Sequence, residues 1–180
     1  MDAGVGTYTR QTFSSERYSI WTMQSNYHNL PLINGVAQSD GSMYKAQHVS
    51  FNASKSRFSA GISAAYKKDA AIKIWQRTYT LSAKGLVIED EFELSKIISP
   101  SVINFLTWAN PDISKPGIVE LIRDGRKVTL AYNKNVFEAR IETIPLEDKR
   151  LSNVWGNEIY RLSLVAKKQA LKDKYQFIIK

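Results

Sequence analysis

Short runs in which apolar and polar residues alternate are the main pattern along this chain. Over residues 71–82, Ile72 and Ile74 fall on one side of an extended chain, and Trp75 and Tyr79 fall on the other. Because large side chains occupy both sides, we expect this strand to lie inside a stack of sheets. Residues 57–66 alternate in the same way and predict another strand.

Turn signals divide the chain into segments of similar length. Ala83-Lys84-Gly85 and Arg123-Asp124-Gly125-Arg126 predict hairpins, and Asn34-Gly35 predicts a tight turn. We also expect a turn at Asn110-Pro111-Asp112 and a polar loop over residues 145–156. The expected strands or extended segments cover residues 7–13, 18–23, 43–51, 57–66, 71–82, 86–94, 102–108, 117–122, 127–132, 136–144, 158–166 and 174–180.

These segments predict an all-β protein. No long amphipathic helix, no internal repeat of fixed period and no Pro/Gly/Ser-rich linker is present. About a dozen strands at this spacing are typical of a β-sandwich. We therefore expect a large antiparallel β-sandwich in a single domain that covers residues 1–180.

Composition narrows the class of protein. Hydrophobic residues make up 43% and charged residues 23% of the 180 residues, as in ordinary globular domains. No apolar run approaches the length of a membrane span, and Met1 is followed by neither a basic start nor an apolar segment. We expect a piece of a longer protein. The absence of cysteine excludes disulfides, thiolate nucleophiles and cysteine-ligated zinc.

Charge favours an anionic partner. The net charge is +8 and the pI is near 9.6, which suits nucleic acid, acidic lipid or acidic polysaccharide. The basic residues are scattered, however, and the only tight clusters are Lys67-Lys68 and Lys167-Lys168. A nucleic-acid-binding domain concentrates its basic residues more strongly, so we do not expect nucleic acid as the partner.

Residues 24–38 contain the most reactive combination of side chains. His28 can carry a proton, bind a metal or donate a hydrogen bond to a sugar oxygen, because the unperturbed pKa of histidine lies near neutrality. The amide of Asn29 beside it both donates and accepts. The alternative is that His28 is a hydrogen-bonded loop residue without a chemical role.

Other candidate groups have simpler explanations. Glu89-Asp90-Glu91 resembles a calcium or carboxylate-pair motif, but alternation along a strand predicts one inward Asp90 between two solvated glutamates. Four tryptophans could form a surface on which a carbohydrate stacks, but their spread over distant strands favours packing in the core. They are Trp21, Trp75, Trp108 and Trp155.

Several motifs taken together resemble the β-domain of heparinase II/III-like polysaccharide lyases. The N-terminal motifs are Asp2-Ala-Gly, Tyr8-Thr-Arg10, Arg17-Tyr18, Ser25-Asn-Tyr-His28-Asn29, Ile33-Asn-Gly35 and Gln38. Further along, Arg77-Thr-Tyr with Gly85-Leu-Val-Ile-Glu-Asp-Glu-Phe is similar to a hairpin of that family, and Trp155-Gly-Asn-Glu-Ile-Tyr-Arg161 is similar to a segment near its C-terminus. The resemblance touches most of the chain.

The resemblance implies one half of a two-part enzyme. Family members join an N-terminal α-helical toroid to a C-terminal β-sandwich, and an acidic polysaccharide lies in the cleft between them. They cleave uronic-acid-containing chains, of the heparan sulfate or alginate type, by β-elimination, and most of their catalytic groups lie in the helical domain. This chain is then one wall of the cleft, without a complete catalytic set, in a periplasmic or secreted parent. A non-catalytic carbohydrate-binding or interaction sandwich is the alternative.

The resemblance also nominates residues. It places Tyr8, Arg10, Arg17 and Tyr18 on the cleft side together with Asn29. Arginine pairs bidentately with carboxylate or sulfate, and tyrosine stacks on a sugar ring. Asp2 and His28 match two ligands of a divalent metal site, zinc or calcium, in the intact parent. The third ligand of the family lies upstream of the Asp2 motif, and His48 does not match it, so we expect an incomplete metal site in this chain.

Overall fold

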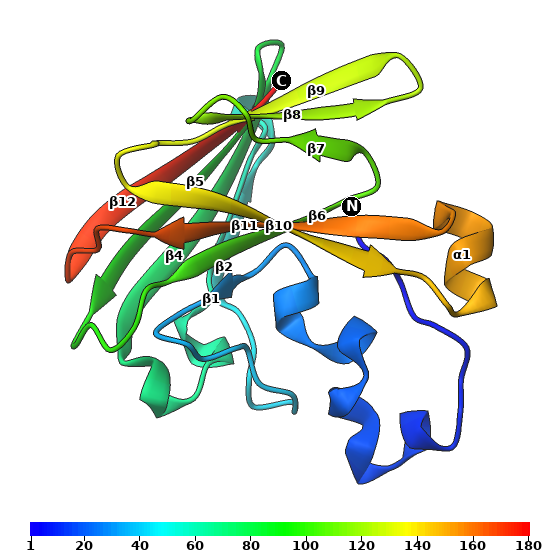
Figure 1. Cartoon of the computed structure of the whole chain (residues 1–180). Helices are drawn as coiled ribbons and strands as arrows, with labels where there is room; N and C mark the ends of the chain where they lie inside the picture. The colour runs from blue at the N-terminus through cyan, green and yellow to red at the C-terminus, as the bar shows by residue number, and fades with distance from the viewer.

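In a computed structural model of the chain, which describes all 180 residues, twelve strands form two antiparallel sheets packed face to face (Figure 1). The predicted all-β sandwich is confirmed. The small sheet has the order β1-β6-β11-β10 and contains β1 (Pro31–Leu32), β6 (Val102–Thr107), β10 (Phe137–Pro145) and β11 (Glu158–Ala166). The large sheet has the order β2-β3-β4-β5-β12-β9-β8-β7. Its strands are β2 (Gln47–Asn52), β3 (Arg57–Gly61), β4 (Ile72–Ser82), β5 (Gly85–Leu94), β7 (Asn110–Asp112), β8 (Ile118–Arg123), β9 (Arg126–Ala131) and β12 (Lys172–Ile179).

The helices are all short. The only α-helix is α1 (Lys149–Trp155), and none of the helices has the length and hydropathy that a membrane-spanning segment requires. Seven 3-10 helices complete the structure: η1 (Gln11–Phe13), η2 (Ser15–Ser19), η3 (Trp21–Met23), η4 (Ser25–Tyr27), η5 (Ala53–Lys55), η6 (Ser63–Ala65) and η7 (Lys68–Ala70).

The expectation of extended segments at residues 7–13 and 18–23 is wrong, because the N-terminal segment folds into η1 to η4. Its serine and threonine side chains bond to the nearby backbone instead of leaving it free for a strand ladder. The hydroxyl of Thr12 accepts from the N–H of Thr9 at 3.0 Å, and the hydroxyl of Ser14 accepts from the N–H of Glu16 at 3.1 Å.

Three other expected segments differ in the structure. The strand expected over residues 57–66 ends at Gly61, and η6 follows it. The expected turn at residues 110–112 is strand β7, which pairs with β8 at the end of the large sheet. The expected loop over residues 145–156 contains α1. This helix begins after Asp148, whose carboxylate accepts from the N–H of Arg150 at 2.8 Å, and it ends at Gly156, where φ is +84°.

Both predicted hairpins are present. The turn at residues 123–126 places Asp124 and Gly125 at φ of +49° and +72°, as a type I′ turn requires. At the β4–β5 turn, Gly85 has φ of +117°, and a Cβ at this position would collide with the carbonyl oxygen of Ile179. That close approach arises because β12 lies between β5 and β9 in the large sheet.

The main core fills the space between the two sheets. Trp75 is fully buried and stacks on Phe92 at 4.7 Å between ring centroids, and Tyr175 lies 4.7 Å from both Phe92 and Phe137. The core role is thus correct for Trp75. The other three tryptophans are half-buried beside a second, smaller cluster that includes Leu106 and Ile159.

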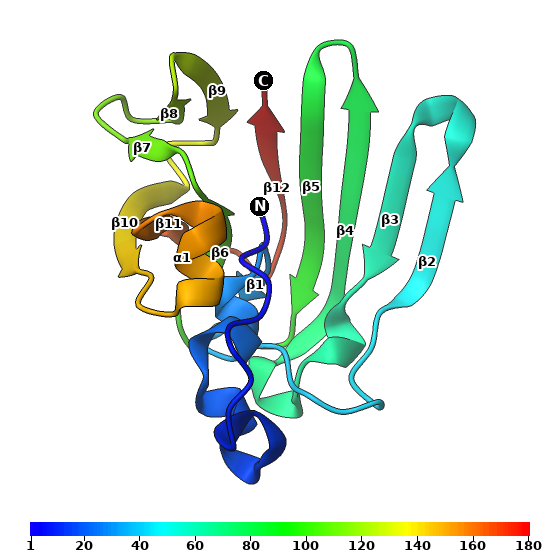
Figure 2. The same ribbon diagram turned by 90° about the vertical axis from the view of Figure 1, so that its right-hand side faces the viewer.

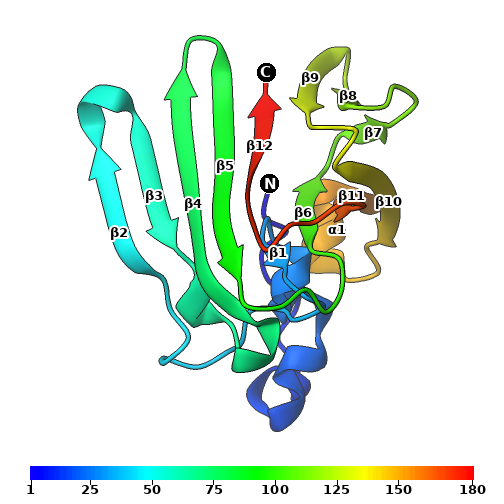
Figure 3. The ribbon, with the colours of Figure 1, turned by 90° about the vertical axis from the view of Figure 1, so that its left-hand side faces the viewer.

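The two sheets differ in extent. Figures 2 and 3 show β2 and β3 extending beyond the small sheet, with no strand facing them. Every residue of β2 is exposed, and the Phe51 side chain, paired in register with Phe58, is 71% exposed. Part of the large sheet therefore presents apolar side chains to solvent.

Candidate functional site

Asn29 joins the N-terminal segment to both sheets. Its amide group donates to the carbonyl of Met1 at 2.7 Å and accepts from the N–H of Leu106 at 3.0 Å. Its own carbonyl accepts from the guanidinium of Arg77 at 2.7 Å. Both the oxygen and the nitrogen of the Asn29 amide are thus bonded to backbone, and the residue positions the loop that contains His28.

The guanidinium of Arg77 is held in turn by Asp90. Two hydrogen bonds of 2.7 and 2.6 Å join them, and both side chains are buried. Burial alone would lower the pKa of Arg77, but the Asp90 carboxylate raises it above the ordinary value. The prediction that Asp90 points inward between two glutamates is confirmed: Asp90 is fully buried, whereas Glu91 is exposed.

The Asn34-Gly35 turn fixes the C-terminal end of the loop that begins at His28. Asn34 is buried with φ of +51°, and Gly35 has φ of +79°. The Asn34 amide donates to the carbonyls of Ala70 and Lys96 at 2.8 and 2.9 Å. Its oxygen accepts from the N–H groups of Ile98 and Ser99 at 2.9 and 3.3 Å. The predicted turn is confirmed, and it also joins three separate segments.

Asp2 and His28, which lie 26 residues apart in the sequence, meet in the structure. The Nδ1 atom of His28 lies 2.6 Å from a carboxylate oxygen of Asp2, and its Nε2 atom lies 3.2 Å from the carbonyl oxygen of Thr22. Both neighbours are acceptors, so the ring donates to both only when it carries two protons. Partial burial opposes ionisation of Asp2, but the Gly4 N–H and His28 outweigh it and lower the Asp2 pKa.

This pair does not fit a metal site of the usual kind. A zinc site uses three or four protein ligands, and no group of three or more His, Asp or Glu side chains lies together in the structure. The other histidine, His48, lies on β2 in the large sheet. Both ring nitrogens of His28 face protein acceptors rather than an open coordination position.

A polar pocket of about 410 Å³ lies beside this pair, and we call it the His28 pocket. It is lined by residues of one continuous loop and the helices before it: Tyr18, Met23, Gln24, Ser25, Asn26, His28, Leu30, Ala37, Gln38, Ser39 and Asp40. The hydroxyl of Ser25 accepts from the N–H of Gln38 at 2.9 Å, which holds the two ends of the loop together. The pocket combines an aromatic ring, an imidazole and several amide groups.

Of the residues nominated from sequence, the structure brings Tyr18 and His28 into this pocket, with Asp2 bonded to His28. Arg17 lies just behind it: a guanidinium nitrogen lies 3.9 Å from the sulfur of Met23, which lines the pocket.

The other three nominees lie elsewhere. Tyr8 packs on Phe13 and lines a separate small pocket of about 170 Å³. Arg10 is exposed and does not line the His28 pocket, and the amide of Asn29 is engaged with backbone. Sequence reasoning missed Gln24, Ser25 and Asp40 as lining residues. Their position beside His28 within one loop was the available signal.

No protein-family model matches the chain, and no curated protein matches it.

Proposed function

We propose that this chain is the β-sandwich domain of a polysaccharide lyase and that the His28 pocket forms part of the wall that binds an acidic polysaccharide. The proposal rests on the sequence resemblance to heparinase II/III-like lyases. The observation that supports it best is the meeting of Tyr18 and His28 in one polar pocket, since both belong to the motifs that carry the resemblance.

The side chains of the pocket suit a uronate-containing chain. Tyr18 is 47% exposed, and its ring is of the kind on which a sugar can stack. The guanidinium of Arg17, beside Met23 of the pocket lining, supplies positive charge near the pocket. In β-elimination the uronate carboxylate must be neutralised before the neighbouring C5 proton can leave, so positive charge here would help the reaction.

In this proposal the chain itself holds no complete catalytic set. An N-terminal α-helical domain of a periplasmic or secreted parent supplies the general base and acid. Our assignment to this chain is limited to binding and orientation of the polysaccharide by Tyr18, His28 and Arg17. No step is assigned to a metal, because Asp2 and His28 alone do not make a site for one.

Binding can be tested by calorimetry and affinity electrophoresis with heparan sulfate and alginate. We expect saturable binding, and we expect Tyr18→Ala to weaken it about tenfold through the loss of stacking. Tyr8→Ala is the matched control, because Tyr8 is similarly exposed but lines a different pocket. Equal effects of the two substitutions, or no binding to any uronate polymer, would contradict the proposal.

Catalysis is tested separately by following the absorbance of the unsaturated product during incubation of the isolated chain with the same polymers. We expect no turnover. Robust turnover would show that the catalytic groups lie within these 180 residues and that their assignment to another domain is wrong.

A second function, a carbohydrate-binding module without catalysis, is favoured by one observation. Both ring nitrogens of His28 are already directed at protein acceptors, so the ring has no free nitrogen with which to exchange a proton with substrate. Binding that is unchanged in His28→Gln and Arg17→Ala would indicate a separate binding face and support this second function.

A further inference from the structure

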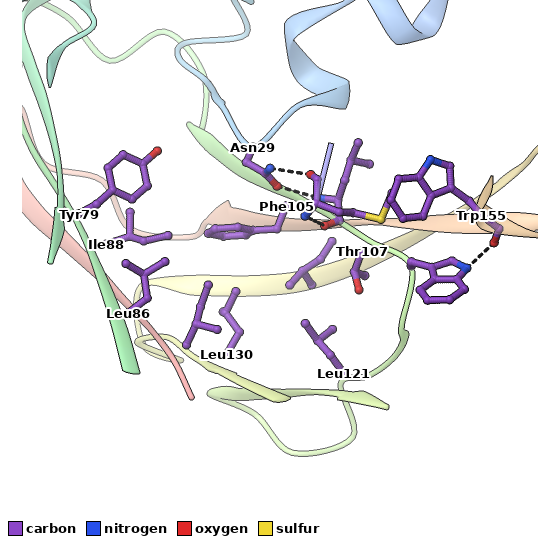
Figure 4. Close-up of a pocket in the computed structure, with 14 residues that line it drawn as sticks. Asn29, Tyr79, Leu86, Ile88, Phe105, Thr107, Leu121, Leu130 and Trp155 are labelled. Atoms are coloured by element: carbon purple, nitrogen blue, oxygen red, sulfur yellow. Dashed lines mark hydrogen bonds between the residues drawn. The ribbon is translucent and has the colours of Figure 1, made fainter. Parts of the chain in front are cut away.

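A second pocket, with a far more apolar lining than the His28 pocket, lies between the two sheets. Its volume is about 480 Å³, and 12 of its 14 lining residues are hydrophobic (Figure 4). Ile88 and Leu130 contribute from the large sheet, and Phe105 and Leu162 contribute from the small sheet. This volume is in the range of pockets that hold small molecules. We call it the inter-sheet pocket.

Apart from the hydroxyl of Tyr79, the polar side chains in this pocket are already bonded to the protein. Asn29 holds Met1 and Leu106, and the hydroxyl of Thr107 donates to the carbonyl of Ala109 at 3.2 Å. The indole N–H of Trp108 donates to the carbonyl of Trp155. A ligand therefore meets hydrocarbon and aromatic surface along the length of the pocket, which selects an apolar group.

The inter-sheet pocket reaches one end of the large sheet. Leu86 and Ile179 both line it and are paired in register on β5 and β12. Leu86 follows the β4–β5 turn at Lys84, and Ile179 precedes Lys180. The apolar wall of the pocket thus ends within two residues of two lysine side chains, both of which are exposed.

Basic residues gather at this end. We define the basic rim as Lys55, Lys84, Arg126 and Lys180, which lie at the β2–β3 turn, in the β4–β5 turn, at the start of β9 and directly after β12. Figures 2 and 3 show the β2–β3 and β4–β5 turns and the C-terminus at the same end of the molecule. Backbone hydrogen bonds of 2.8 and 3.0 Å between Lys180 and Thr129 place β9 beside the C-terminus.

The rim carries little compensating negative charge. Lys55, Lys84, Arg126 and Lys180 take part in no ion pair. No aspartate or glutamate occurs between residues 41 and 68, the stretch that contains the β2–β3 hairpin. Positive charge therefore borders an apolar pocket, an arrangement that suits a ligand with an anionic head and a hydrocarbon chain.

We propose that this end of the sandwich binds an anionic single-chain amphiphile, with the hydrocarbon chain in the inter-sheet pocket and the anionic head at the basic rim. The site is separate from the His28 pocket and shares no lining residue with it. Its test is therefore independent of the proposed polysaccharide function.

Dodecanoate below its micellar concentration is the probe, and binding is measured by calorimetry and by tryptophan fluorescence. Trp108 and Trp155 line the pocket, so a chain that enters it should change their emission. We expect saturable binding of one molecule per chain. No binding, or heat without any change in tryptophan emission, would overturn the proposal.

The role of the rim is tested with the double substitution Lys84→Glu and Lys180→Glu. We expect dodecanoate affinity to fall by about tenfold, because two attractive charges become repulsive near the head group. The matched control is Lys67→Glu with Lys68→Glu. These lysines are exposed, carry the same charge and lie at the opposite end of β4. Equal losses in both double variants would mean that net charge, rather than a site, governs binding.

The role of the pocket is tested with Leu86→Asp, which places a charge at its opening. The control is Val87→Asp, whose side chain lies on the opposite face of β5 and does not line the pocket. We expect binding to be lost only in Leu86→Asp. Co-sedimentation with phosphatidylglycerol vesicles distinguishes a lipid bilayer from a free amphiphile as the source. Dodecanoate binding that persists in Leu86→Asp would overturn the pocket assignment, and vesicle binding that is lost in the same variant would indicate a lipid as the source.

Discussion

Arg77 and Asp90 form a buried bidentate ion pair between the neighbouring strands β4 and β5, and the third bond of the guanidinium holds the carbonyl of Asn29. One side-chain pair in the large sheet thus fixes the loop that carries His28. The contact explains why an arginine and an aspartate, each costly to bury alone, are both present in the core.

Arg77→Met should therefore destabilise the fold by about 3–5 kcal/mol, because it leaves the Asp90 carboxylate buried without a partner. Urea unfolding measures the change. The control is Lys73→Met, which breaks an ion pair with Glu93 on the same two strands, but at the surface. We expect a small effect there. A small effect of Arg77→Met as well would show that the buried pair does not contribute to stability.

Asn34 allows the backbone and side-chain contributions of the turn to be separated. Asn34→Gly keeps a residue that tolerates φ of +51° but removes four hydrogen bonds of the amide, and we expect it to cost about 3 kcal/mol. Asn34→Ala should cost about 1 kcal/mol more, because alanine is strained at positive φ. Thermal and urea unfolding measure both. Equal stability of Asn34→Gly and Asn34→Ala would argue against backbone strain of alanine at this position.

Acid should release the N-terminal segment from α1. Asp148 accepts from the N–H and the hydroxyl of Thr7 at 2.7 and 3.1 Å, and the Thr7 N–H is the main cause of its lowered pKa. A carboxyl whose pKa is lowered by folding stabilises the fold above its unfolded pKa, near about 3.9, and loses this contribution as the pH falls through its folded pKa. Asp2 shows a shift in the same direction.

The amide resonance of Thr7 should thus titrate below about pH 3.9 in NMR spectra, with the change that accompanies loss of a hydrogen bond. Asp148→Asn, which cannot ionise, should abolish this transition while the Gly4 amide, bonded to Asp2 at 2.8 Å, still titrates. A Thr7 resonance that does not respond to acid in the unsubstituted chain would show that Asp148 does not hold Thr7.

Asn29 should act on stability rather than on carbohydrate affinity. Asn29→Ala removes the bonds to Met1 and Leu106, and we expect it to destabilise the fold by about 2 kcal/mol. Variant protein that remains folded should bind uronate polymers as the unsubstituted chain does. Calorimetry beside urea unfolding tests this. Normal stability with weakened binding would restore Asn29 to the substrate-binding set.

The strands of the sandwich were largely predictable because alternation and turn residues are local signals. Residues 71–82 and 86–94 match β4 and β5 closely, and the inward Asp90 follows from strand geometry alone. The N-terminal segment was not predictable in this way. Its serines and threonines suit strands and turns alike, and the hydrogen bonds that Thr12 and Ser14 accept from the N–H groups of Thr9 and Glu16 favour the turns.

The candidate site was likewise predictable only where it depends on residues that are close in the sequence. Tyr18 and His28 lie ten residues apart and meet in one pocket through local chain folding. Tyr8 and Arg10 are also close in sequence, but η1 and η2 turn them away from that pocket. The role of Asn29 depends on Leu106 and Arg77, which are distant in sequence, so no local signal could have revealed it.

The position of β12 constrains how the protein folds. This strand lies between β5 and β9 and pairs with residues of β5 that are about 80 to 90 positions earlier in the sequence, so the large sheet has a gap until residues 172–179 are available. The two parts of the sheet precede these residues in the sequence and cannot be joined until β12 is present. We therefore expect closure of the core to be a late step, and folding to be slow on the scale of small domains.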